Sequence, residues 1–308
     1  MKLRAWWVAI ALAMVAGIVW LGLYERARFA AQSPAGMLRR LPVQNAAVLF
    51  VDFEALRRGG FLKLLSPSKT SEEPDYQGFV RASGFDYRND LDLAAVSFSN
   101  DGTFFVIKGR FDWKKLESYA GSQGGTCSNH MCRMPGSAPE RRISFYPLQS
   151  NLMALAVSND SSAVMRLQEA FSGAVQPLDL PSDPVWFSIP AENLKGARQL
   201  PGGAHVFATA LASADKILLS LGPEGQQFEA RLAVTCRNST DAALLVLQLQ
   251  RATSLLRDTI AHENQKPDPK DLSGVLTAGV FQQTGRRVFG RWPLPPVFLD
   301  SLLAGGTL

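Results

Sequence analysis

Histidine and cysteine are both scarce in this sequence, whose 308 residues include three of each. The histidines are His130, His205 and His262. A Ser-His-acid catalytic constellation needs a histidine base, but the sequence has no G-x-S-x-G motif, and "GSQGG" at residues 121–125 has a different order. His262 and Glu263 begin a zinc-protease pattern, yet Lys266 stands where the second histidine would be. We therefore expect no catalytic residues of these classes.

Motifs for cofactors and metals are also missing. The sequence has no glycine-rich phosphate loop and no dinucleotide-binding fingerprint. Asp86, Asp90 and Asp92 lie close together, but a calcium loop of the EF-hand type also needs a turn glycine and a closing glutamate, which are absent. We expect a solvated turn there, with a weak cation site as the alternative. We predict no cofactor and no metal centre.

An excess of positive charge is missing from most of the chain, although the whole sequence has a net charge of +5. Residues 1–40 hold six of the 32 basic residues and one of the 27 acidic ones, so residues 41–308 carry 26 of each. A protein that binds duplex nucleic acid needs a basic face on its folded part. The basic cluster "TGRRVFGRW" is local. We expect no nucleic-acid partner.

One long hydrophobic run is present at the start of the sequence. From Ala5 to Leu23 the chain has nineteen residues without a charge. A helix of that length spans about 28 Å, close to the hydrocarbon thickness of a bilayer. Aromatic residues typical of a membrane interface lie at both ends; they are Trp6, Trp7, Trp20 and Tyr24. We predict a membrane partner, contacted through a single spanning helix over residues 5–23.

A cleaved secretory signal is the alternative to this anchor. Such a signal ends in small residues at a cleavage site, and the following "YERARFAAQSPAG" offers no good site. No cysteine lies in the first forty residues, so we expect no lipoprotein anchor. Basic residues flank both sides of the run, but long domains cross a membrane largely regardless of charge. We place residues 1–28 as an anchor with a short cytoplasmic tail in the cell inner membrane, and residues 29–308 outside the cytoplasm.

The rest of the chain alternates between strand and helix patterns in an order that occurs twice. Each part is expected to form a strand, a helix, a hairpin, a helix, a hairpin and a helix, with turns at "NDG", "LQSN", "GPEG" and "QQTGR". The segment "VQPLDLPSDP" separates the parts as a linker. We predict an α+β fold of two similar halves, residues 29–174 and 183–308, each a mainly antiparallel sheet with helices on one face.

The sequence also predicts where some helices begin and which side of a helix faces the core. Asp112 is a predicted N-cap, as is Asn159 or Asp160 for the next helix. The apolar run after Thr240 is too short for a second membrane span. It carries a stripe at three- and four-residue spacing, formed by Leu245, Leu249, Ala252, Leu256 and Ile260. The stripe predicts a helix that faces the core, with a groove for a partner helix as the alternative.

Two of the cysteines, Cys127 and Cys132, lie five positions apart in "GGTCSNHMCRMPG". Zinc takes four ligands, and this segment offers these two and His130 at an unusual spacing. In an oxidising compartment we expect a Cys127–Cys132 disulfide. A metal site and free thiols are the alternatives. Cys236 ends an alternating strand and is expected to be a buried apolar residue.

The segments "GFDYRNDLDLAAVS" and "DLSGVLTAGVFQQTGRRVFGRW", together with the anchor and the strand–helix start, resemble single-pass membrane-anchored bacterial proteins of unknown function. The resemblance covers most of the chain. It implies a bacterial cell envelope and transfers no functional residue.

These observations favour a membrane-anchored extracytoplasmic protein that binds a protein or an apolar ligand, or acts as a scaffold, without catalysis. An envelope hydrolase with an unrecognised active site is the alternative. We expect a cleft between the halves, with apolar walls around Val185–Ile189 and Leu152–Val157 and few groups able to transfer protons.

Overall fold

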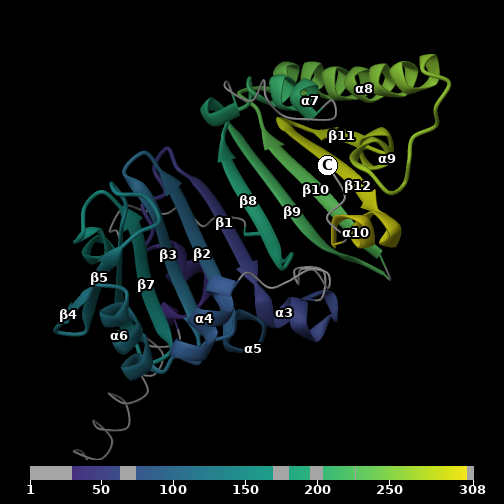
Figure 1. Cartoon of the computed structure of the whole chain (residues 1–308). Coiled ribbons are helices and arrows are strands. Elements are labelled where there is room, and N and C mark those ends of the chain that lie inside the picture. Colours follow the sequence, from purple (N-terminus) through teal and green to yellow (C-terminus); the bar gives the residue numbers. More distant parts are fainter. Residues whose placement is uncertain (1–29, 63–73, 169–179, 195–203, 226, 304–308) are drawn as a thin grey trace, which may run out of the picture.

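A computed structural model describes residues 30–62, 74–168, 180–194, 204–225 and 227–303 (Figure 1). The predicted membrane span and its aromatic rim lie outside the described residues. Among the helices that are described, none is long and apolar enough to cross a membrane.

Strands and helices are mixed along the chain, as an α+β fold requires. The helices are α2 (Pro34–Leu38), α3 (Phe53–Arg58), α4 (Pro74–Ser83), α5 (Tyr87–Asp90), α6 (Trp113–Ser122), the 3-10 helix η2 (Ala163–Leu167), α7 (Ala204–Leu211), α8 (Ser239–His262), α9 (Leu272–Thr277) and α10 (Pro296–Leu303). The strands are β1 (Ala47–Asp52), β2 (Leu91–Ser99), β3 (Gly102–Gly109), β4 (Thr126–Ser128), β5 (Met131–Pro135), β6 (Arg142–Gln149), β7 (Leu152–Ser158), β8 (Val185–Pro190), β9 (Lys216–Glu224), β10 (Gln227–Thr235), β11 (Val280–Thr284) and β12 (Arg287–Leu294).

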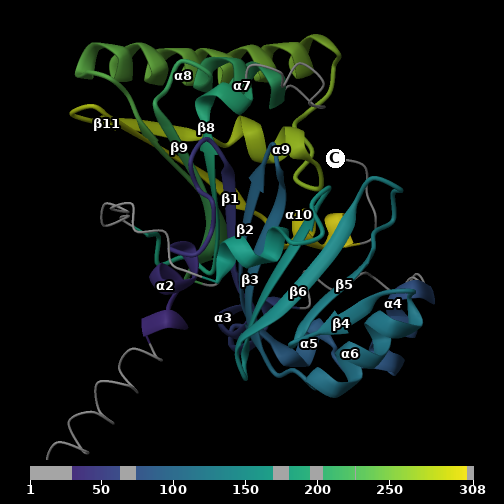
Figure 2. The same cartoon turned by 90° about the vertical axis from the view of Figure 1, so that its left-hand side faces the viewer.

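The strands form one 12-stranded sheet in the order β11-β12-β10-β9-β8-β1-β2-β3-β7-β6-β5-β4. Each pair of neighbours in this order is antiparallel, which confirms the predicted antiparallel sheet. At its middle, Phe50 of β1 lies opposite Trp186 of β8, and the two rings stack with centroids 5.4 Å apart. Figure 2 shows how strongly the sheet twists between its two ends.

All four predicted hairpins are present, as β2–β3, β6–β7, β9–β10 and β11–β12. Each turn signal lies between two runs rich in apolar residues, and the length of the turn sets the register of the two strands. Gly285 in the β11–β12 turn has a φ of 59°, a left-handed conformation that suits glycine.

Side-chain caps fix the starts of several helices. Asp112 caps α6 as predicted, because its carboxylate accepts a hydrogen bond of 3.2 Å from the amide of Lys115. Asn238 caps α8 in the same way, through the amide of Asp241 at 2.8 Å. The helix predicted after Asp160 is shorter than expected. The described part of that segment forms only the 3-10 helix η2.

Helices cover both faces of the sheet at β3 and β7, so the prediction of helices on one face is wrong there. Alternate residues of a strand point to opposite faces. Leu152 and Ala154 of β7 are buried in a cluster with Met37 of α2. Met153, between them, is buried with Leu116 of α6. Both faces of β7 are therefore apolar and need cover, which one layer of helices cannot provide.

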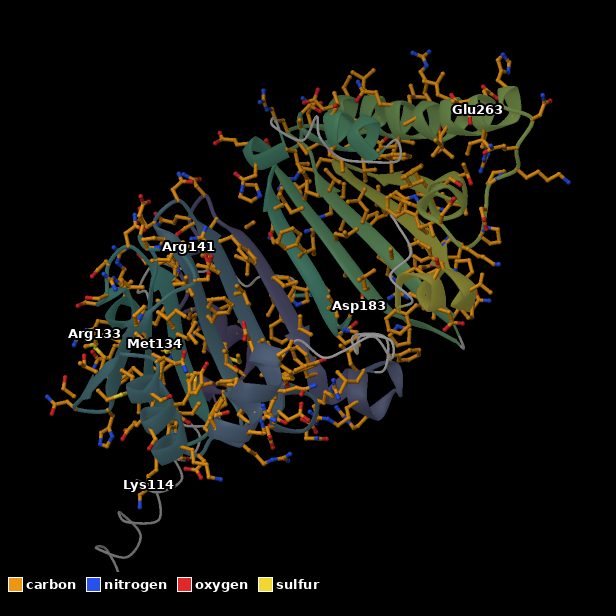
Figure 3. All side chains as sticks on the ribbon, viewed as in Figure 1. Lys114, Arg133, Met134, Arg141, Asp183 and Glu263 are labelled. Atoms are coloured by element: carbon orange, nitrogen blue, oxygen red, sulfur yellow. A yellow bond between two sulfur atoms is a disulfide. The ribbon has the colours of Figure 1, made fainter. Side chains whose placement is uncertain are left out.

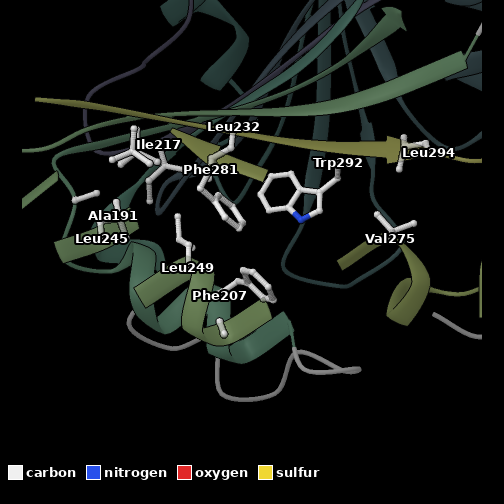
Figure 4. Packing of buried hydrophobic residues seen from close by; sticks show 14 of the residues in the cluster. Ala191, Phe207, Ile217, Leu232, Leu245, Leu249, Val275, Phe281, Trp292 and Leu294 are labelled. Atoms are coloured by element: carbon white, nitrogen blue, oxygen red, sulfur yellow. The ribbon is translucent and has the colours of Figure 1, made fainter. Parts of the chain in front are cut away.

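A third cluster of buried residues lies between the strands β9, β10, β11 and β12 and the helices α7, α8, α9 and α10 (Figure 4). Leu245 and Leu249 of the predicted α8 stripe are 2% and 0% exposed, which confirms that the stripe faces the core. Phe281 and Trp292 pack edge to face with centroids 5.3 Å apart. All four helices meet the sheet through this one cluster, so they lie on one face of β9, β10 and β12.

Candidate functional site

The opposite face of β9, β10 and β12 has no described helix packed on it. Leu232 and Val234 of β10 point into the cluster beneath α8, so the residues that alternate with them point away from it. We call this surface the open face. It consists of Lys216, Leu218 and Ser220 of β9, Arg231, Ala233 and Thr235 of β10, and Arg287, Phe289 and Arg291 of β12.

The strand register arranges the open face in three rows that run across the strands. The first row contains Lys216, Thr235 and Arg287. The second row contains Leu218, Ala233 and Phe289. The third row contains Ser220, Arg231 and Arg291. An apolar row therefore lies between two rows that contain cationic side chains.

The twist of the sheet hollows this face into a groove of about 590 Å³. Binding sites for ligands commonly have volumes of a few hundred Å³ and more. Among the described residues, its lining includes no carboxylate and five cationic side chains, which are Lys216, Arg231, Arg286, Arg287 and Arg291. Phe289, which is 39% exposed, also lines the groove. The groove can therefore attract an anionic group and cover an apolar one.

The charge of three of these cations is not neutralised within the described part of the chain. Lys216, Arg286 and Arg291 have no ion pair there, and all three are exposed. Asp215, which precedes Lys216, is instead 3.7 Å from Arg237. These three side chains remain available to an anionic partner.

Arg231 differs from them because it is tied to three carboxylates. Its guanidinium lies 2.6 Å from Asp183 and 2.9 Å from Glu229, and it also contacts Glu224. Burial lowers the pKa of Arg231, but the three negative charges outweigh this effect, so the pKa is raised. Ser220 donates a second hydrogen bond to Asp183, at 2.5 Å. The network fixes Asp183 against β9 and β10. Asp183 lies two residues before β8 and is labelled in Figure 3.

The predicted Cys127–Cys132 disulfide is present. Its cysteines lie opposite each other in the β4–β5 hairpin, a hairpin that the sequence did not predict. Its turn residues Asn129 and His130 have φ angles of 50° and 62°, which two-residue hairpin turns require. Cys236 is 3% exposed, as expected, and burial and two nearby carboxylates raise the pKa of its thiol.

The histidines do not form a catalytic constellation in the described residues. His130 is exposed, and its Nδ1 lies 3.5 Å from Glu117 of α6. His262 is in the last turn of α8. The side chain of His205 lies outside the part that can be described. No group of three or more metal-ligating side chains occurs among the residues that the structure places.

The aspartates at the start of β2 serve local structure. Asp86 caps α5 and accepts a hydrogen bond of 2.9 Å from the hydroxyl of Tyr76. Asp90 pairs with Arg110 at 3.0 Å, and Asp92 lies 3.8 Å from Arg57. Their oxygens therefore have protein partners.

The predicted cleft between Val185–Ile189 and Leu152–Val157 is not formed. These segments belong to β8 and β7, which are separated by β1, β2 and β3 in the sheet. Because β8 pairs directly with β1, the two parts join through backbone hydrogen bonds. The open face was missed, although its signal is visible in "RRVFGRW", where cationic and aromatic residues alternate with buried ones.

Comparisons with known proteins add little to this picture. No protein-family model matches the sequence, and no curated protein is similar to it by sequence. Among solved structures, crystal form III of TP0453 is similar with a TM-score of 0.48 and 10% identity, over 87% of this chain and 98% of that one. Crystal form IV of TP0453 gives a TM-score of 0.46 and 10% identity, over 87% and 96%. Nothing about function follows from similarity at this level.

Proposed function

We propose that the chain is a membrane-anchored extracytoplasmic binding protein without catalytic activity, and that the open face is the surface that binds its partner. One observation carries the proposal: a row of two half-buried apolar residues that ends at the exposed Phe289 lies in a groove whose described lining has cations and no carboxylate. Aromatic residues and arginine are the side chains enriched at protein interfaces. An exposed apolar surface with a polar rim is typical of an interaction site.

The lining of the groove also favours binding over catalysis. Its described residues include no histidine, cysteine or carboxylate that could take up and release a proton. Its hydroxyl groups belong to Ser220 and Thr235. Ser220 donates its hydrogen bond to Asp183.

The proposal also includes two similar halves joined through β1 and β8. Strand order supports it: β1-β2-β3-β7-β6 in one direction from the centre corresponds to β8-β9-β10-β12-β11 in the other. In both series the third strand neighbours the fourth, β7 or β12, which is the second strand of the hairpin β6–β7 or β11–β12. The antiparallel β1–β8 pair would relate the halves by an approximate two-fold rotation.

We place these halves outside the cytoplasm, held at the inner membrane by residues 5–23. The uncharged run of that segment supports the anchor. The Cys127–Cys132 disulfide supports an oxidising compartment.

Site-specific crosslinking in native membranes tests the binding surface. A photoreactive amino acid replaces Phe289 in the full-length chain, and the crosslinked product is identified by mass spectrometry. Leu247, which is 62% exposed on α8, is the control position. We expect a product from position 289 that is lost in the Lys216→Glu, Arg291→Glu double variant. Products from position 247 but none from position 289 would contradict the proposal.

A further inference from the structure

We infer that the open face binds an amphipathic helix of another protein, one whose apolar stripe is flanked by carboxylates. This inference rests on the proposed function, because it names the partner of the same surface.

The described helices α2 and η2 cover the part of this face that lies next to the open face. Trp186 of β8 lies opposite Ser220 of the open face on one side and opposite Phe50 on the other. The open face therefore continues the face on which Phe50 and Trp186 are buried with α2 and η2. No described helix continues this layer over β10 and β12. A helix from a partner would extend it.

The spacing of the cations on the open face matches the width of a helix. Arg287 and Arg291 on β12 flank the apolar row and are four residues apart, a separation of about 13 Å along a strand. A helix with its side chains is about 10–12 Å in diameter. A helix that lies along the apolar row would therefore have cations on both sides, with Lys216 and Arg287 on one and Arg291 on the other.

The cations of the open face would complement carboxylates on the flanks of such a helix. Lys216 and Arg291 have no ion pair in the described chain and lie on opposite sides of the row of Leu218, Ala233 and Phe289. Carboxylates on both flanks of a helix would pair with them, and its apolar stripe would cover the row. Complementary potentials of this kind speed association and exclude partners of the wrong charge.

Two other occupants fit the groove less well. An acyl chain needs most of its surface buried, and a single apolar row on an open sheet face can bury only one side of it. A second copy could offer the exposed leucines of α8, Leu244, Leu247 and Leu255. Arg251 lies within that stripe, so its charge repels the cations of the open face.

The probe is a synthetic 18-residue helical peptide with a leucine stripe and glutamate flanks, labelled with a fluorophore. Its binding to the full-length chain in nanodiscs of neutral phosphatidylcholine is followed by fluorescence anisotropy. A peptide with the same stripe and lysine flanks is the control. We expect the glutamate peptide alone to bind, and the Lys216→Glu, Arg291→Glu variant to bind it at least tenfold more weakly. The Arg251→Glu, Lys266→Glu variant has the same change of charge at exposed positions outside the open face and should bind as wild type does.

If the glutamate peptide does not bind, or binds equally to both double variants, the inference that the partner is a helix is wrong. If vesicles with phosphatidylglycerol bind through Lys216 and Arg291 while the peptide does not, the face recognises lipid. If sedimentation instead shows self-association that these charge reversals abolish, the occupant is a second copy. Each of these results overturns the helix and leaves the open face as a binding surface. That broader proposal fails separately, through the crosslinking test at position 289.

Discussion

Arg231 belongs to the open face, yet its first role is structural. Asp183 and Glu229 have side chains that are only 12% and 13% exposed, and their charges are compensated by this one guanidinium. Removing one partner of a buried ion pair leaves a charge without compensation, which is more destabilising than the loss of the attraction alone. Arg231 thereby joins the segment before β8 to β9 and β10.

Substitution Arg231→Leu should lower the free energy of unfolding by about 2 kcal/mol, because two largely covered carboxylates lose their partner. Urea unfolding followed by circular dichroism measures the change. Glu224→Gln is the matched control, since Glu224 is 65% exposed in the same network and should change stability by less than about 1 kcal/mol. Equal stability of Arg231→Leu and wild type would show that the network contributes nothing.

Tyr76 is the titratable group with the clearest consequence for pH dependence. Burial, followed by its hydrogen bond to Asp86, raises the pKa of Tyr76 to about 12, and the amide of Tyr87 partly offsets this. An unfolded chain has the ordinary tyrosine pKa of about 10. The protonated phenol therefore favours the folded state fully below pH 10, and this contribution is lost as the pH rises through about 12.

Absorbance at about 295 nm should thus show a tyrosine step near pH 12, above the value of about 10 for an unfolded chain. In Tyr76→Phe the late step should disappear, and the loss of stability between these two pH values should become smaller. A late step that persists in Tyr76→Phe would assign the raised pKa to another tyrosine.

At the scale of elements, the four predicted hairpins were predictable because each depends on a turn and the two runs beside it. The α8 stripe was predictable for the same reason, since its spacing is local. The pairing of β1 with β8 was not, because nothing in "AVLFVD" or "VWFSIP" specifies a partner far away in the chain. The open face could be recognised only once the side covered by α8 was known.

The β4–β5 hairpin shows how a local covalent link can matter for one element alone. Within the described residues β4 pairs only with β5 and is the last strand of the sheet. A disulfide that closes so short a loop stabilises by about 2 kcal/mol in the chain-entropy account. This contribution should be confined to the edge.

Reduction of the disulfide should therefore speed amide exchange in residues 126–135 by about an order of magnitude or more, while β1, β2 and β3 exchange as before. Hydrogen exchange with mass spectrometry, with and without a phosphine reductant, measures this. In the Cys127→Ser, Cys132→Ala variant the exchange should already be fast, and the reductant should change nothing further. Faster exchange throughout the sheet would mean that the hairpin is needed for the whole fold.

At the scale of the whole molecule, the segment that follows the proposed anchor is also part of the core. Met37, Leu38 and Leu41 are 0%, 2% and 1% exposed and pack against β1, β3 and β7. Burial of each side chain contributes roughly 2 kcal/mol, so the three together approach the total stability of about 5–15 kcal/mol of an ordinary domain. Within the described residues, the chain therefore has no free linker of any length between Ala30 and the core.

Two truncations should separate the anchor from the fold. A chain that begins at Ala30 should keep the circular dichroism and thermal unfolding of the full-length protein but no longer sediment with membranes after a carbonate wash, because only residues 5–23 insert. A chain that begins at Asn45 also loses Met37, Leu38 and Leu41, and it should be unfolded or destabilised by several kcal/mol. The Met37→Ala, Leu41→Ala variant of the Ala30 chain should fall between them. If the Ala30 chain stays with the membranes, the folded part itself binds them; if the Asn45 chain is as stable as the longer one, α2 is not part of the core.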